Sequence, residues 1–312
     1  MQATTEGTER TKERETKRLP PWFRIHLTAN ERSSDVRRLI RRHNLHTVCS
    51  SAACPNRTEC WNAGTATFMI LGNVCTRDCL FCNIPTGKPN NVDDDEPNRV
   101  ARAVAALRLN YAVVTSVTRD DLADGGASLF AETIKAIRGT SPGCMVEVLI
   151  PDFRGSEASL GMVLDAAPDV LNHNMETVTS LYPRVRPQAD YQRSLELLSR
   201  AHGYGAITKT GLMLGLGERI DEVRSVMNDL RGIGCDILTL GQYLQPSKIH
   251  VRVVKYYHPD EFEALRNEAI SLGFRHVSAG PMVRSSYRAD RMGARSSQQP
   301  VTQASQVMRD EQ

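Results

Sequence analysis

Six of the chain's eight cysteines lie between residues 49 and 82, in two triplets with different spacings. The triplets are Cys49-x4-Cys54-x5-Cys60 and Cys75-x3-Cys79-x2-Cys82. Thiolates are soft ligands that suit iron–sulfur clusters or zinc, and zinc usually takes cysteines in pairs or with a nearby histidine. A four-iron, four-sulfur (4Fe–4S) cubane needs one ligand per iron, so three cysteines leave one iron for a small molecule or a distant residue. The triplets therefore predict two clusters, each one protein ligand short.

Two other uses of these cysteines stay open at this point. Disulfide frameworks belong mainly to small secreted domains, whereas a chain of 312 residues can bury a hydrophobic core without them. A structural zinc site is the second alternative, and a brown chromophore containing iron and sulfide would exclude it. Cys144 and Cys235 have no partner at cluster spacing, so we expect them to be small buried side chains.

Composition indicates an ordinary globular protein, with 40% hydrophobic and 24% charged residues and a mean hydropathy of −0.37. No run of 18 apolar residues is present and the glutamate-rich N-terminus does not resemble a targeting sequence, so we expect a cytoplasmic protein without a membrane segment. Residues 1–45 hold eleven Lys and Arg against six Asp and Glu. Aromatic residues make up only 5% of the chain and do not interleave with basic runs, so we expect no nucleic-acid partner.

Strand-like apolar runs alternate with helical patterns through the middle of the chain. The predicted strands span 66–71, 111–115, 145–150, 169–172, 206–214 and 236–243. The predicted helices cover 100–107, 129–137, 157–166, 190–201 and 220–231. Sustained alternation of this kind predicts an α/β fold with a parallel sheet.

The positions of the functional residues favour a barrel over a doubly wound sheet. They come directly after predicted strands, and cysteines stand where a Rossmann sheet would carry GxGxxG. We therefore predict a partial (β/α)6 TIM-like barrel with N- and C-terminal extensions, whose mouth carries the second triplet. The predicted domains are 1–65, an extension with the first triplet; 66–273, the barrel; and 274–312, an extension with an RSSY motif and a disordered polar tail.

The segment from Cys75 to Cys82, CTRDCLFC, resembles the cluster motif of radical S-adenosylmethionine (SAM) enzymes. The resemblance implies that three thiolates hold a 4Fe–4S cluster whose fourth iron binds SAM. Reductive cleavage of SAM would then give a 5′-deoxyadenosyl radical that abstracts hydrogen from unactivated carbon, chemistry that belongs to the cofactor. Further blocks are similar, in order, to those of the lipoyl synthase family within this superfamily. These are GTATFMILGNVCTRDCLFC, TSVTRDDLADGGA, DVLNHNMETV, VRPQADY, KTGLMLGLGE, LTLGQYLQPS and RSSYRAD.

The first triplet resembles the auxiliary-cluster motif of the lipoyl synthase family. That resemblance implies that Ser286, the second serine of RSSY, supplies the fourth ligand, with Ser285 as the alternative. A serine oxygen is a harder ligand than a thiolate and matches an iron–sulfur site poorly, so its iron would be the cluster's weakest point. The auxiliary cluster is thereby implied to be the sulfur donor.

The family reaction inserts two sulfur atoms at carbons 6 and 8 of a protein-bound octanoyl-lysine, consuming two SAM molecules and forming the lipoyl group. The implied enzyme is a sulfurtransferase. Its implied partners are octanoylated lipoyl-carrier domains, of 2-oxo acid dehydrogenase subunits or the glycine-cleavage H protein, and an electron donor such as ferredoxin or flavodoxin.

Five residues that end or follow predicted strands are candidates for binding SAM. They are Thr115, Ser116, Asn172, Glu176 and Lys209. Lys209 lies in an apolar strand, where a buried ammonium needs either the SAM carboxylate or a structural ion pair. His173 is expected to be structural, and Arg184 and Arg186 receive no site role.

Two related functions remain as alternatives. A ferredoxin-like electron carrier would not cleave SAM and would not need six βα units. A biotin-synthase-like or methylthio-transferring enzyme would share the radical step but would give a product of different mass.

Overall fold

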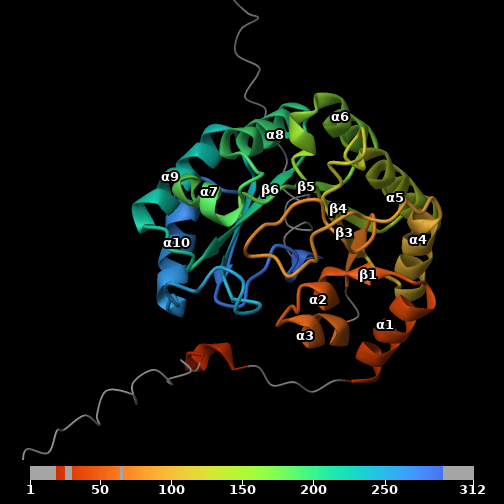
Figure 1. The fold of residues 1–312 in the computed structure, drawn as a ribbon, viewed down its shortest axis with the longest axis horizontal. Coiled ribbons are helices and arrows are strands. Elements are labelled where there is room, and N and C mark those ends of the chain that lie inside the picture. Colours follow the sequence, from red (N-terminus) through yellow and green to blue (C-terminus); the bar gives the residue numbers. More distant parts are fainter. Residues whose placement is uncertain (1–18, 25–29, 64–65, 291–312) are drawn as a thin grey trace, which may run out of the picture.

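The computed structural model describes residues 19–24, 30–63 and 66–290. An eight-stranded sheet lies at its centre, with the strands in sequence order from β1 to β8 (Figure 1). β1 pairs with β2 antiparallel, and every later pair is parallel. The strands are β1 (His46–Thr47), β2 (Thr67–Ile70), β3 (Tyr111–Ser116), β4 (Met145–Leu149), β5 (Val170–Asn172), β6 (Thr208–Leu214), β7 (Ile237–Gln242) and β8 (His276–Gly280).

Helices surround the sheet. In Figure 1, α4, α5, α6, α8, α9 and α10 form an arc, α7 lies on its inner side, and α1 to α3 lie at its open side. The α-helices are α1 (Glu31–Arg42), α2 (Val48–Ser51), α3 (Arg57–Asn62), α4 (Glu96–Leu107), α5 (Ala127–Thr140), α6 (Glu157–Asp165), α7 (Tyr182–Val185), α8 (Tyr191–Gly203), α9 (Ile220–Gly232) and α10 (Pro259–Ser271). The 3-10 helices are η1 (Pro21–Phe23), η2 (Phe153–Gly155) and η3 (Thr179–Leu181). No helix of the described segments is long and apolar enough to cross a membrane.

The prediction of a parallel, barrel-like sheet is confirmed, and all six predicted strands are present within two residues of their expected bounds. A seventh parallel strand, β8, was missed. Its sequence, HVSAG, has a single large apolar residue, so it does not give the apolar run by which a buried strand is identified. β8 lies within the segment predicted to be the C-terminal extension.

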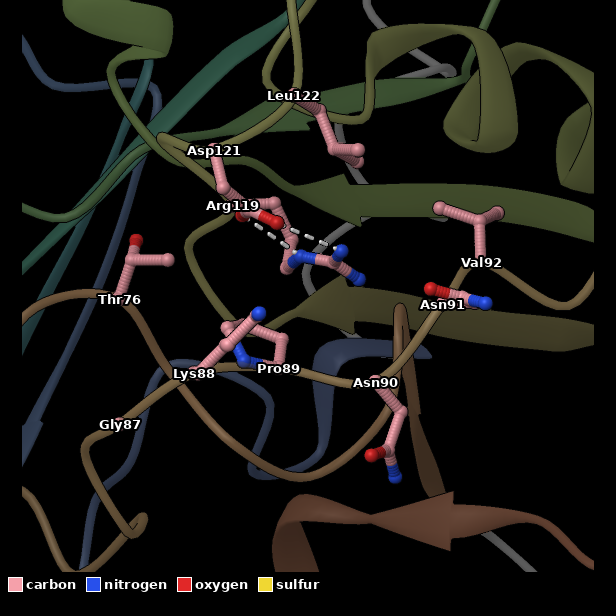
Figure 2. A pocket seen from close by; sticks show the side chains of 10 residues that line it. All are labelled: Thr76, Gly87, Lys88, Pro89, Asn90, Asn91, Val92, Arg119, Asp121 and Leu122. Carbon is pink, nitrogen blue, oxygen red and sulfur yellow. Dashed lines mark hydrogen bonds and ion pairs between the residues drawn. The ribbon is translucent and has the colours of Figure 1, made fainter.

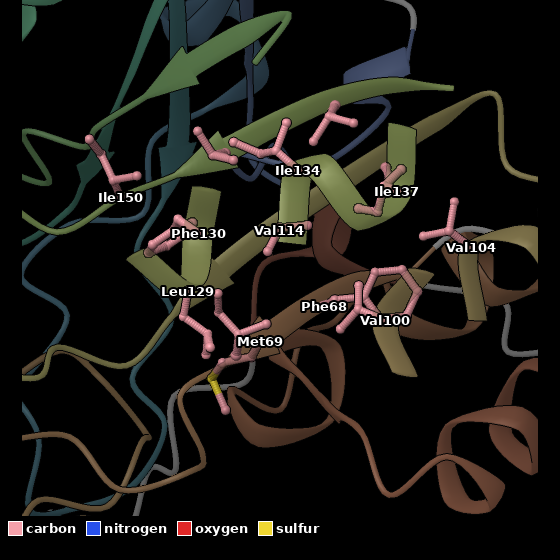
Figure 3. Close-up of a cluster of buried hydrophobic side chains, with 14 of the residues drawn as sticks. Phe68, Met69, Val100, Val104, Val114, Leu129, Phe130, Ile134, Ile137 and Ile150 are labelled. Atoms are coloured by element: carbon pink, nitrogen blue, oxygen red, sulfur yellow. The ribbon is translucent and has the colours of Figure 1, made fainter. Parts of the chain in front are cut away.

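The core between sheet and helices follows from helical spacing. Val100 and Val104 are four residues apart in α4 and so share one face, which is buried against the sheet. Phe130 and Ile134 do the same in α5, and Figure 3 shows Val100 of α4 beside Phe68 of β2. This packing fixes the strands whose carboxyl ends carry the site.

Both predicted extensions meet beside β2, at the gap in the arc. In the described residues β8 has no strand partner besides β7, so the barrel is partial. The side-chain amide of Asn56 donates to the Met282 carbonyl at 2.7 Å, and the Tyr287 hydroxyl donates to Glu59 at 2.8 Å. A Cβ on Gly241 would collide with the Val283 carbonyl, so only glycine lets the C-terminal segment approach β7 this closely.

The polar tail beyond residue 290 lies outside the described residues, so its predicted disorder stays a prediction.

Candidate functional site

The second cysteine triplet lies on the loop that leaves β2, where backbone hydrogen bonds fix its course. Cys75 donates its N–H to the Pro85 carbonyl at 2.8 Å, and the Cys82 N–H donates to the Cys79 carbonyl at 3.0 Å. The Leu80 N–H reaches across the mouth to the Val185 carbonyl at 2.9 Å. The three thiols are therefore held on a closed turn at the carboxyl end of the sheet, as a barrel active site requires.

Arg77, inside this loop, forms a buried ion-pair clamp. Its Nε and Nη2 donate to the two carboxylate oxygens of Asp120, at 2.7 and 2.9 Å, and Nη2 also donates to Asp152 at 2.6 Å. Burial by itself would raise the pKa of Asp152, but its hydrogen bond and ion pair with Arg77 outweigh burial and hold the pKa below the ordinary value. The clamp ties the cysteine loop to the loops after β3 and β4.

Two thiols of this loop, those of Cys79 and Cys82, are protonated when free of metal. Burial raises the pKa of Cys79 to about 11 and that of Cys82 to about 12. Because a metal or cluster binds the thiolate, loading this loop must release protons, and bound iron would supply the positive charge that stabilises the thiolates.

The first triplet lines a pocket between α2, α3 and the C-terminal segment. Residues from both ends of the chain line it, and these include Cys49, Cys54, Cys60, Thr67, Arg284 and Ser286. In the described residues no three His, Cys, Asp or Glu side chains gather closely enough to hold one metal ion. The three thiols and one hydroxyl instead surround a shared space, which suits the donor set of a multi-iron cluster.

The two serines of RSSY point to different places. The Ser286 hydroxyl lies in the cysteine pocket and accepts a hydrogen bond from the Thr67 hydroxyl at 2.8 Å. The Ser285 hydroxyl contacts the end of β5, receiving a hydrogen bond from Asn172 at 2.8 Å and donating to Asn174 at 2.9 Å. Only Ser286 shares the pocket with the first triplet.

The two cysteine regions are in contact. Asn83, one residue after the second triplet, donates from its side-chain amide to the carbonyl of Ser51, inside the first triplet, at 2.9 Å. This hydrogen bond places the two cysteine-bearing segments side by side.

Of the five predicted SAM-binding residues, two have buried oxygens that find no hydrogen-bond partner among the residues that the structure describes. These are the Ser116 hydroxyl, at the end of β3, and the Asn172 Oδ1, at the end of β5. Buried polar atoms are nearly always hydrogen-bonded, so these oxygens are free for a ligand at the mouth. Thr115 instead donates to the Leu149 carbonyl at 2.8 Å and is committed to the strand β4 beside it.

Glu176 has a left-handed backbone with φ of 65° and accepts a hydrogen bond from Asn174 at 3.1 Å. Burial raises its pKa, while the Arg186 charge opposes that shift. A left-handed φ at a non-glycine residue costs free energy and is often found where function requires it.

Lys209 makes the structural ion pair that the sequence left open. Its Nζ lies 2.9 and 3.0 Å from the two carboxylate oxygens of Glu147, and both side chains are fully buried. The Tyr111 hydroxyl donates to the same carboxylate at 2.7 Å, and the Asn172 amide donates at 2.9 Å. This network fills the barrel interior beneath the mouth and orients Asn172.

His173 is structural, as expected: its ring nitrogens contact the Ile150 carbonyl at 2.9 Å and the Ser194 hydroxyl at 3.1 Å. Burial lowers the pKa of His173 to about 4, so the ring is neutral near pH 7.

Arg186 was missed by the sequence reasoning, which gave it no site role. It is buried, donates to the carbonyls of Asn174 and Met175 at 2.9 and 3.0 Å, and keeps its Nε without a partner. After burial, which raises the pKa of Cys79, the charge of Arg186 is the main influence that lowers it. The VRPQADY block, in which Arg186 directly precedes Pro187, was the available signal.

A cavity of about 660 Å³ lies beside the loop of the second triplet (Figure 2). Its lining includes Thr76, Lys88, Asn90 and an ion pair between Arg119 and Asp121 at 2.9 Å. It contains no cysteine and none of the five predicted SAM-binding residues, so we do not assign it to the site.

Residues 69–230 match the family model of the radical SAM superfamily. Over 284 residues the chain is 55% identical to the lipoyl synthase of Koribacter versatilis, covering 90% of this chain and 93% of that protein. It is 53% identical over 273 residues to the lipoyl synthase of Chlorobaculum tepidum, covering 87% of this chain and 94% of that protein.

Solved structures show the same fold at low sequence identity. Streptococcus suis SuiB bound to S-adenosylmethionine superposes with a TM-score of 0.52 at 9% identity, over 69% of this chain and 50% of that chain. Methylornithine synthase superposes with a TM-score of 0.50 at 14% identity, over 81% of this chain and 82% of that chain.

Proposed function

The chain belongs to the lipoyl synthase family of radical SAM enzymes, and from this membership we propose how its residues divide the work of inserting two sulfur atoms into an octanoyl chain. We assign Cys75, Cys79 and Cys82 to a 4Fe–4S cluster that activates SAM. We assign the first triplet and Ser286 to a second 4Fe–4S cluster, which donates the sulfur. The single observation that carries this proposal is the pocket that joins the first triplet to Ser286.

When bound, the clusters and SAM supply the electron, the hydrogen-abstracting radical and the sulfur, which are beyond the reach of protein side chains. The protein binds and orients them. Ser116, Asn172 and Glu176 at the mouth would contact SAM, with Thr115 beside them shaping the strand end. For Lys209 we propose a supporting role. Its charge is neutralised by Glu147, and the same Glu147 carboxylate accepts a hydrogen bond from Asn172.

Each sulfur insertion breaks one C–H bond and forms one C–S bond, at carbon 6 or carbon 8. The hydrogen leaves in 5′-deoxyadenosine, so two SAM molecules are consumed for each lipoyl group. Arg186 would position the Cys79 side of the mouth, since it holds the Asn174 and Met175 carbonyls while its charge faces Cys79.

The substrate of lipoyl synthases is presented by a lipoyl-carrier protein. We propose octanoyl-lysine on a 2-oxo acid dehydrogenase subunit or on the glycine-cleavage H protein, a ferredoxin or flavodoxin as electron donor, and a cytoplasmic location. We also propose residues 66–273 as the radical SAM barrel, flanked by extensions 1–65 and 274–312 that together build the auxiliary site.

The test is anaerobic reconstitution with iron and sulfide, followed by incubation with SAM, dithionite and an octanoyl-lysine peptide, with products identified by mass spectrometry. We expect 5′-deoxyadenosine together with peptides carrying one and then two sulfur atoms. The Cys54→Ala variant should keep forming 5′-deoxyadenosine and lose thiolation, because it removes a ligand only from the auxiliary pocket.

Two outcomes would contradict the proposal. Cleavage of SAM with an unchanged octanoyl peptide would reject the substrate. Full thiolation by Cys54→Ala would reject the auxiliary pocket as the source of sulfur.

A further inference from the structure

Exposed apolar and basic side chains lie on the second cysteine loop and on the segment 248–254, which is hydrogen-bonded to that loop. We call this group the rim patch, and it consists of Leu80, Lys248, Ile249, Arg252 and Val254. Large apolar side chains are normally covered, yet Ile249 is 87% exposed, Val254 is 61% exposed and Leu80 is 41% exposed. An apolar group of this kind, with charges at its edge, is typical of a surface that binds another protein.

The patch is fixed to the cysteine loop through its backbone. The Val251 N–H donates to the Leu80 carbonyl at 3.0 Å, and the His250 Nε2 lies 3.0 Å from the Cys82 carbonyl. A carbonyl can only accept, so His250 carries its proton on Nε2, and its Nδ1 accepts from Ser247 at 2.9 Å. The patch therefore cannot shift without moving the loop.

Side chains alternate along this segment in the manner of an extended strand. Val251 is buried in a hydrophobic cluster, and both the partly buried Val253 and Phe81 of the cysteine loop pack against that cluster. Arg252 and Val254, between and after them, point to solvent. The sequence thus uses one face to pack on the cluster loop and leaves the other face available.

The two cations of the patch have no partner within the protein. Across the described segments neither Lys248 nor Arg252 forms an ion pair or side-chain hydrogen bond, whereas nearby Lys255 is paired with Glu261 at 2.6 Å. Unpaired cations around an apolar centre attract an acidic partner over long range and speed its association.

We propose that the rim patch is the docking surface of a small acidic electron-transfer protein that reduces the radical SAM cluster. This inference rests on the proposed function, because it takes Cys79 and Cys82 as ligands of that cluster. Leu80 lies in the sequence between Cys79 and Cys82, and its side chain is exposed. A donor bound to Leu80 would therefore approach the cluster from the solvent side of the cysteine loop. SAM and the octanoyl chain, by contrast, would occupy the inside of the mouth, where Ser116 and Asn172 have free oxygens.

The size and charge of the patch suit this partner. Electron-transfer proteins bind their partners with low affinity and through small interfaces. Their association depends on electrostatic steering more than on the area buried. Each SAM cleaved takes one electron from the docked donor, which is oxidised by one electron, and lipoyl formation takes two such encounters.

The test compares two reductants for the same reaction, formation of 5′-deoxyadenosine from SAM. One is dithionite, a small molecule, and the other is flavodoxin kept reduced by its NADPH-dependent reductase. We expect Arg252→Glu to lower the flavodoxin-driven rate at subsaturating flavodoxin about tenfold at low ionic strength, with the loss shrinking as salt is added. Ile249→Ser should lower it several-fold, and both variants should keep the dithionite-driven rate.

Binding provides a readout that needs no turnover. The Kd of flavodoxin for each variant, measured by fluorescence anisotropy, should rise in parallel with the loss of rate. Lys135→Glu and Met162→Ser are matched controls, because they change an exposed cation on α5 and an exposed apolar residue on α6, away from the patch. Both should leave rate and Kd unchanged.

Each other outcome overturns the docking proposal. If the variants keep both the flavodoxin-driven rate and the Kd, the donor binds elsewhere. If they instead raise the KM for an octanoylated H protein under dithionite, with the flavodoxin rate intact, the patch binds the carrier. If the wild-type protein forms no 5′-deoxyadenosine with dithionite, the proposed function itself is rejected. This outcome is distinguishable from a failure of the docking proposal, because it requires no variant.

Discussion

The two cysteine regions are held in place by contacts of different kinds. The loop of the second triplet is clamped by Arg77, whose side chain is 6% exposed, against Asp152, whose side chain is 0% exposed. The pocket of the first triplet is closed by Arg288 and Glu59, whose side chains are 50% and 47% exposed. Breaking a buried pair leaves an uncompensated charge, whereas an exposed pair contributes little. The loop of the second triplet is thus held by a pair that is costly to break, and the pocket of the first triplet is bordered by a pair that is not.

This difference fits the roles assigned to the two clusters. A cluster that reduces SAM must survive each turnover, and a rigid loop serves it. A cluster that gives up sulfur must be dismantled and rebuilt, and a pocket closed by weak contacts and one oxygen ligand permits that.

Removing the Arg77 clamp should have the largest effect. Arg77→Met leaves the buried Asp152 with only its longer ion pair, to Arg193 at 3.2 Å, and should lower the free energy of unfolding by about 3 kcal/mol, measured by urea denaturation of the protein without metal. Arg288→Met is the matched control and should cost less than about 1 kcal/mol. Equal losses for the two variants would remove the distinction between the regions.

Strengthening the weak ligand should slow sulfur transfer. Ser286→Cys supplies a fourth thiolate to the auxiliary pocket, and we expect thiolation of the octanoyl peptide to fall at least about tenfold, or 1.4 kcal/mol in the barrier. Formation of 5′-deoxyadenosine should continue. The iron released during turnover, measured with a coloured chelator, should fall in the same proportion. Thiolation at the wild-type rate would argue against the Ser286-bound iron as the weakest point of the cluster.

Lowering the pH should reduce the free energy of unfolding through protonation of His173 in the unfolded chain. Its pKa is lowered to about 4 in the folded protein, so between pH 6.5 and pH 4 the unfolded chain binds a proton that the folded protein does not. Stability falls as the pH falls through this range, by about 1 kcal/mol at pH 5.5 for this residue. His173→Gln should be less stable at pH 7.5 but lose less between pH 7.5 and 5.5, as urea midpoints would reveal; identical slopes would contradict the assignment.

Much of the fold was predictable because helices and strands of a βα repeat differ in the spacing of their apolar residues. The six strands found from the sequence are apolar runs between helical patterns, whereas β8 is short and rich in small residues, so it has no such signal. α10 carried a signal that was passed over, since Phe262, Leu265 and Ala269 follow helical spacing.

The site divides in the same way. The cysteines were identified by spacing, which is a local property, and Ser286 came from resemblance to a family motif. Arg77 acts through Asp120, 43 residues further along the chain, and Arg186 stands out by its burial. Neither a long-range contact nor burial can be deduced from the spacing of residues in the sequence. Lys209 was correctly expected to need a partner, but only the structure identifies Glu147.

The auxiliary pocket joins residues near the start of the chain to Ser286 near its end, and this has a consequence for biosynthesis. A ribosome releases Cys49, Cys54 and Cys60 long before it adds the serine, so a growing chain displays these three thiols without the complete pocket. Any cluster delivered at that stage would lack its oxygen ligand. Loading of the auxiliary site should therefore follow translation, and a chain truncated before the RSSY motif would keep every cysteine and still be unable to close the pocket.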